Sequence, residues 1–159
     1  MFMTIQWIKL IISLLVPQII GFVGALFTTD SVKTWYVTII KPTFNPPNWI
    51  FGPVWTLLFV LMGIGLYLVW SKGLNVNGVK LAIIIFAIQL ALNLIWSILF
   101  FGLHNPLAAL IEIFVLWVSI LLMIIFFWQV SPIAAYLQIP YLLWVTFATI
   151  LNFSIVLLN

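Results

Sequence analysis

Five apolar segments dominate this sequence and leave room for little else. Each has the length at which a chain of apolar residues, about 20 of them, crosses the roughly 30 Å hydrocarbon core of a bilayer as an α-helix. The sequence therefore predicts an all-α, integral membrane bundle of five transmembrane helices, with residues 1–159 forming a single domain. The segments span residues 5–27, 49–71, 79–101, 106–128 and 133–157.

Composition supports a membrane location and excludes several functional classes. Of the 159 residues, 67% are hydrophobic and only 4% are charged, which is more apolar surface than a soluble domain of this size can bury. The positive charges are five scattered lysines, so no nucleic-acid-binding surface is expected. The sequence has no cysteine for a disulfide, a thiolate metal site or a nucleophile. Sparse positive charge supplied only by lysine, together with the lack of cysteine, is more typical of a bacterial or archaeal chain than of a mitochondrial one, so we expect a prokaryotic cell membrane as the location.

The first connection, residues 28–48, is the only long one. Asp30 is predicted to cap a short interfacial helix in its first half. Pro42, Pro46 and Pro47 prevent helix formation in its second half, which is predicted to form a stiff lid. Because the other connections are short, consecutive helices are expected to be antiparallel neighbours.

Two predicted helices carry polar and tryptophan side chains on a single face. Polar side chains at bilayer depth normally face the bundle interior. In the fifth helix, Trp144, Ala148 and Asn152 recur at a spacing of four, which also fits ordinary knob-and-hole packing. The presence of two such stripes favours a shared cavity. In the third helix the stripe consists of Gln89, Asn93, Trp96 and Ser97.

The opposite face of the third helix is suited to close helix contact. Ala87 and Ala91 form a small-xxx-small pair nearly opposite Gln89 and Trp96. We expect this face to form a seam between two copies of the chain, and hence a homodimer.

Glu112 is the only carboxylate near the predicted hydrocarbon core. Its residue type allows two interpretations, a proton or ligand contact and a satisfied hydrogen bond between helices, and the sequence leaves both open.

His104, the only histidine, has no second histidine or cysteine with which to form a metal site. It is expected in a loop at the headgroup level, with a single axial haem bond as the alternative. Ser97 and Glu112 lack a histidine at their depth for a catalytic triad, so classical acid–base or nucleophilic enzymology is not expected.

Five motifs in register carry a resemblance to a known family. With these motifs the whole chain resembles the translocator protein family, TspO, also called the tryptophan-rich sensory protein or peripheral-type benzodiazepine receptor family. The motifs are TWY at 34–36, KPTFNPPNWIFGPVWTLLF at 41–59, QLALNLIWSILFF at 89–101, HNPLAALIEI at 104–113 and IPYLLWVTFATILN at 139–152.

The resemblance implies a homodimeric membrane receptor that binds porphyrins, such as protoporphyrin IX or haem, and other planar apolar molecules, with no required cofactor. It also implies that Trp55 and Trp144 match indoles proposed to act in light- and oxygen-dependent porphyrin breakdown. No basic residue follows Tyr141, so sterol binding through the carboxyl-terminal motif of animal members is not expected. The implied ligand contacts are Tyr36, Pro42, Trp49, Trp55, Phe59, Gln89, Asn93, Trp96, Ser97, Glu112, Trp144 and Ala148.

Two other functions remain as alternatives, a transporter of porphyrin-like or amphiphilic molecules and a ligand-responsive sensor or scaffold. The absence of a visible inverted repeat argues against alternating access, and the short loops offer little surface to a partner.

Trp49 and Trp55 differ by six residues and must face different directions, so Trp55 is predicted to face the cavity and Trp49 to be an interface anchor or rim contact.

Overall fold

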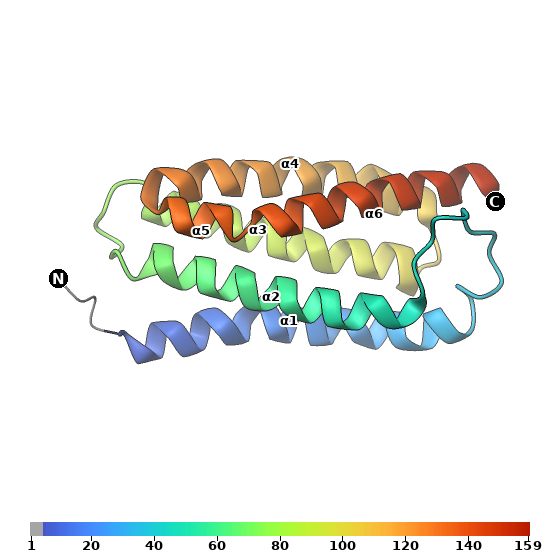
Figure 1. The fold of residues 1–159 in the computed structure, drawn as a ribbon, viewed down its shortest axis with the longest axis horizontal. Helices are drawn as coiled ribbons and strands as arrows, with labels where there is room; N and C mark the ends of the chain where they lie inside the picture. Colours follow the sequence, from blue (N-terminus) through green and yellow to red (C-terminus); the bar gives the residue numbers. More distant parts are fainter. Residues whose placement is uncertain (1–4) are drawn as a thin grey trace.

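A computed structural model describes residues 5–159 as an elongated bundle of helices that lie along one another (Figure 1). Five segments, counting α3 with η1 and α5 with α6 as one each, are long and apolar enough to cross a membrane. The predicted all-α five-helix bundle is confirmed, and the described residues contain no strand. The elements are α1 (Trp7–Lys33), α2 (Asn48–Trp70), α3 (Val79–Ser97), the π-helical η1 (Ile98–Gly102), α4 (Pro106–Val130), α5 (Pro132–Tyr136) and α6 (Ile139–Leu158).

The first helix is longer than predicted. It continues to Lys33 instead of ending near residue 27, so Asp30 lies inside α1 and caps no separate helix. The threonines after residue 27 bond within the helix, as in the 3.0 Å bond from the Thr28 hydroxyl to the Gly24 carbonyl. Such back-bonding satisfies a polar side chain without interrupting the helix. The change from apolar to polar residues after residue 27 therefore does not mark the end of α1.

The fifth span is interrupted, whereas the sequence predicted one helix over 133–157. Two residues separate α5 from α6, and Pro140 stands in the first turn of α6, where its missing N–H costs little. The buried Gln138 amide spans the break by donating to the carbonyls of Leu61 in α2 and Ala134 in α5, each at 3.2 Å. This bond ties the break to the middle of α2.

The half of the bundle farthest from the 34–47 loop is filled by a cluster of buried apolar side chains. The backbones of α1 and α2 come into contact there at Gly63. A Cβ added to Gly63 would lie 2.7 Å from the Ser13 carbonyl oxygen and 2.8 Å from the Leu14 Cα. The buried side chains that fill this half include Met62, Val69, Val79, Phe86, Met123 and Phe127.

The 34–47 loop is held by its own polar contacts. The Lys41 ammonium donates to the carbonyls of Tyr36 (2.6 Å) and Ile39 (2.9 Å), and it lies 4.9 Å from the centre of the Tyr36 ring. The Tyr36 hydroxyl donates to Asn45 Oδ1 at 2.7 Å. The loop thus has the contacts expected of a stiff lid.

The same loop is joined to the end of α6. Asn159 accepts from the Ile40 amide at 2.9 Å and donates to the Ile40 carbonyl at 3.0 Å. The carboxyl terminus therefore lies beside this loop, at the end of the bundle opposite the start of α1 (Figure 1).

Replacing Gly63 with alanine is expected to lower the free energy of unfolding by about 1–3 kcal/mol, because the new methyl group would overlap fixed backbone atoms of α1. Reversible unfolding in mixed micelles, followed by tryptophan fluorescence, measures the effect. Gly52→Ala is the matched control, because Gly52 is also in α2 and its added Cβ meets no atom within 4 Å. Equal stability of the two variants would contradict the proposed backbone contact.

Tyr36 is expected to ionise only at a pH well above that of an exposed tyrosine. Burial raises the pKa of its hydroxyl from 10.0 to about 12. Because the folded state favours the neutral phenol, this contribution to stability is complete below pH 10 and is lost as the pH rises toward 12.

The measurement is the phenolate absorbance of the wild type minus that of Tyr36→Phe, which should show a midpoint near 12 in the folded protein. In denaturant the same difference should move to about 10. A midpoint near 10 in the folded protein would show that Tyr36 is not buried by the loop.

Candidate ligand-binding site

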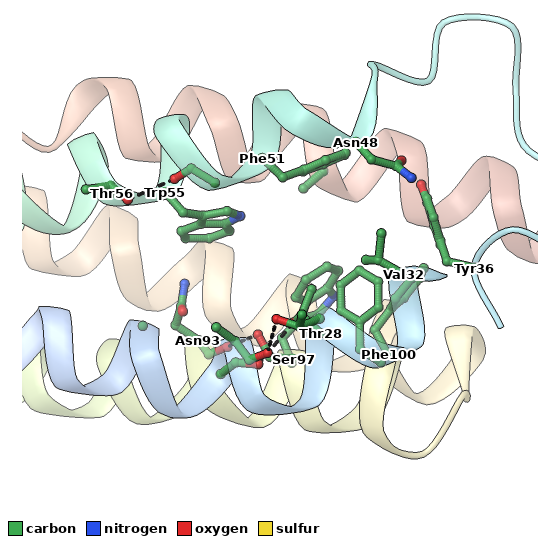
Figure 2. Close-up of a pocket in the computed structure, with 18 of the residues that line it drawn as sticks. Thr28, Val32, Tyr36, Asn48, Phe51, Trp55, Thr56, Asn93, Ser97 and Phe100 are labelled. Atoms are coloured by element: carbon green, nitrogen blue, oxygen red, sulfur yellow. Dashed lines mark hydrogen bonds between the residues drawn. The ribbon is translucent and has the colours of Figure 1, made fainter. Parts of the chain in front are cut away.

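A cavity of about 530 Å³ occupies the half of the bundle next to the 34–47 loop. Residues of α1, α3 and η1 form one wall, residues of α2 and α6 form the other, and Tyr36 lies at the loop end (Figure 2). Toward the loop, the contacts of α1 shift from α2 to α3. At Gly24 α1 packs on α3, where an added Cβ would lie 3.4 Å from the Ser97 hydroxyl oxygen.

Two indoles line the α2 and α6 wall. Trp55 stacks on Phe59, with ring centres 5.5 Å apart, and meets Tyr141 edge-on at 6.2 Å. Trp144 meets Phe51 edge-on at 6.0 Å. Among residues 5–159, neither indole N–H has a hydrogen-bond partner. Both indoles therefore combine apolar ring surface with a donor available to a ligand.

Trp96, on the opposite wall, is fixed by one hydrogen bond and by ring contacts. Its indole N–H donates to Asn152 Oδ1 at 3.2 Å, and the Asn152 amide donates to the Pro106 carbonyl at 2.8 Å. Its ring stacks on Phe100 with centres 5.2 Å apart. Because its donor is already used, Trp96 contributes a rigid apolar surface to the site.

Asn93 forms the polar floor of the cavity. Its amide nitrogen donates to the buried Tyr141 hydroxyl at 3.0 Å. This bond orients the side chain and leaves its carbonyl oxygen as an acceptor for a bound molecule.

Most of the side chains predicted as ligand contacts meet at this cavity. Four do not line it, namely Pro42, Trp49, Gln89 and Glu112. The eight that line it are Tyr36, Trp55, Phe59, Asn93, Trp96, Ser97, Trp144 and Ala148.

Gln89 and Glu112 lie within the bundle, away from the cavity walls. Gln89 shares a helix face with Trp96, but it lies farther from the loop, where the bundle is packed solid. Helical spacing predicts the direction of a side chain and says nothing of the depth at which a cavity ends. Within the described residues, the side-chain polar atoms of Gln89 and Glu112 have no hydrogen-bond partner.

Trp49 and Pro42 lie outside the cavity for different reasons. The side chain of Trp49 is 74% exposed on α2, as an interface anchor requires. Pro42 belongs to the loop and contributes no lining atom.

No residue of α1 was among the predicted ligand contacts, although α1 contributes to the cavity wall. The signal was a run of small, polar and apolar residues at alternating spacings of three and four, which places one helix face toward the cavity. It contains no tryptophan and only one amide side chain, so it did not stand out from ordinary packing. The residues are Gln18, Gly21, Ala25, Thr28 and Val32.

Two other predicted features lie away from the cavity. His104 stacks on Trp35 at 4.6 Å, with Nε2 3.1 Å from the Ser31 hydroxyl, and residues 5–159 contain no group of three metal-ligating side chains. Ala87 and Ala91 are exposed on the outer face of α3. This leaves the face free for a second copy, and the homodimer stays a prediction.

Comparison with known proteins agrees with the geometry. A family model described as the TspO/MBR family matches residues 13–158. The Tryptophan-rich protein TspO of Archaeoglobus fulgidus is 50% identical, over 96% of this chain and 97% of its own length. The human Translocator protein is 36% identical, over 94% and 89% of the two chains. The Tryptophan-rich sensory protein of Cereibacter sphaeroides is 34% identical, over 86% and 82%. With five helices able to span a bilayer, this chain is a multi-pass integral membrane protein and belongs to the TspO/MBR family.

Proposed function

We propose that the protein is a membrane receptor for a planar, mostly apolar tetrapyrrole such as protoporphyrin IX or haem. The observation that carries this proposal is the aromatic-walled cavity of about 530 Å³ beneath the 34–47 loop. Its volume falls within the range of about 300–1,000 Å³ that small-molecule sites occupy, and such sites are typically apolar with a few well-placed polar groups.

The walls suit a flat conjugated ring. Trp55 and Trp144 offer indole surface on one side and Trp96 on the other. Each aromatic contact contributes about 0.5–1.5 kcal/mol beyond the area that it buries. The two unbonded indole N–H groups and the Asn93 carbonyl oxygen would supply the directional contacts that fix the orientation of the ring.

Packing favours binding over passage through the bundle. The cavity stops near Phe59 and Asn93, and the other half of the bundle is filled by buried side chains. A transport cycle would have to open that half. The names of the relatives include both translocator and sensory proteins, and a binding step precedes either activity.

We further propose that the bound porphyrin can be broken down in light, with Trp55 and Trp144 as the first protein groups to react. Both indoles line the cavity, so both would lie beside the excited ring. The ligand absorbs the light and dioxygen is the oxidant, while the protein holds the ring and the indoles together.

Replacing Trp55 or Trp144 with leucine is expected to weaken porphyrin binding by about two- to tenfold, because an aromatic contact with the ring is lost. Absorbance and fluorescence titrations in a nonionic detergent measure the affinity. Trp55→Phe and Trp144→Phe should retain most of the affinity yet slow photobleaching, because phenylalanine stacks but is harder to oxidise.

Trp128→Leu is the control, since Trp128 packs against Tyr136 outside the cavity. Its affinity should match that of the wild type. Unchanged affinity and unchanged photobleaching in all four cavity variants would overturn the assignment of the site.

A further inference from the structure

The two lysines at the loop end of the bundle have different environments. Lys41 is committed to the loop, with its ammonium bonded to two carbonyls and placed over the Tyr36 ring. Lys33 ends α1, is exposed and lines the cavity. Within the described part of the chain it has no hydrogen bond or ion pair. Lys33 is therefore the cation available to a bound molecule.

The cavity lining changes in character from its floor to its mouth. Near the floor lie Phe59, Trp55 and the neutral amide of Asn93. Near the mouth lies Lys33, the only charged residue among those that line the cavity in the described structure. Asp30, one turn earlier on α1, is exposed and is not part of the lining. The site thus has an uncharged interior and a single positive charge at its entrance.

We infer that Lys33 recognises a carboxylate of the ligand at the mouth of the cavity. On this basis the site selects amphiphiles whose planar apolar body lies between the indoles and whose anionic end reaches the entrance. A neutral ester of the same molecule keeps the apolar contacts and loses the contact with the ammonium. The inference rests on the proposed function and adds the chemical class of its ligands.

The charge of Lys33 is expected to raise the affinity for the free acid by a small factor and to leave the affinity for the ester unchanged. An ion pair in contact with water is weak, and salt screens it. Loss of the Lys33 ammonium should therefore lower the affinity for a free acid by about two- to fivefold. It should leave the affinity for the ester unchanged, because stacking is not affected by the charge.

The experiment compares protoporphyrin IX with its dimethyl ester on the wild type, Lys33→Gln, Lys33→Arg and Asp30→Asn, in nonionic detergent at low and high salt. The wild type and Lys33→Arg should prefer the free acid, with a preference that shrinks as salt is added. Lys33→Gln should lose the preference, because its affinity for the free acid falls while its affinity for the ester stays the same. Asp30→Asn should keep or increase it.

The same series is repeated with pyrenebutyric acid and its methyl ester, which share the acid-to-ester change on another planar ring. If Lys33→Gln lowers the affinity for the acid and for the ester equally, or lowers neither affinity, the inference is overturned. If only the pyrene pair binds and shows the Lys33-dependent preference, the inference stands and the tetrapyrrole proposal fails. If neither pair binds the wild type, both proposals fail.

Discussion

The backbone contact between α1 and α2 at Gly63 is the constraint on which the rest of the bundle depends. Ser13 and Leu14 of α1 lie directly against α2 there, whereas Gly24, farther along α1 toward the loop, packs on α3. A helix rises about 1.5 Å per residue, so α1 changes partner over roughly 16 Å. The gap between α1, α2 and α3 where this change of partner occurs is the cavity.

Specific bonds keep the gap from closing. In lipid, apolar burial gives little preference for one helix pairing over another, and close packing and hydrogen bonds decide the arrangement. The bonds from Asn93 to Tyr141 and from Trp96 to Asn152 hold the third span to the last one around the cavity. The contacts of Lys41 and Tyr36 fix the loop next to the cavity. Site and fold are therefore maintained by the same few interactions.

The sequence was sufficient for the features that depend on composition and helical direction. The five spans follow from apolar length, and most of the tryptophan and polar stripe positions lie at the cavity. The sequence was insufficient where a neighbouring element decides the outcome. Threonine back-bonding lets polar side chains lie in α1 past residue 27, and the break before α6 is supported by the bond from Gln138 to α2. Whether Gln89 reaches the cavity depends on where neighbouring helices close the cavity, and the sequence of one helix does not determine that position.

The central claim is that the cavity beneath the 34–47 loop holds the ligand, and the absence of cysteine from the sequence allows a direct test. Ala148→Cys places a thiol on the α6 wall of the cavity, and Ala87→Cys places one on the exposed face of α3. The measurement is the rate of maleimide labelling of each variant with and without protoporphyrin IX. The account predicts that porphyrin slows labelling at position 148 and leaves position 87 unchanged. Equal rates at position 148 with and without saturating porphyrin would contradict it.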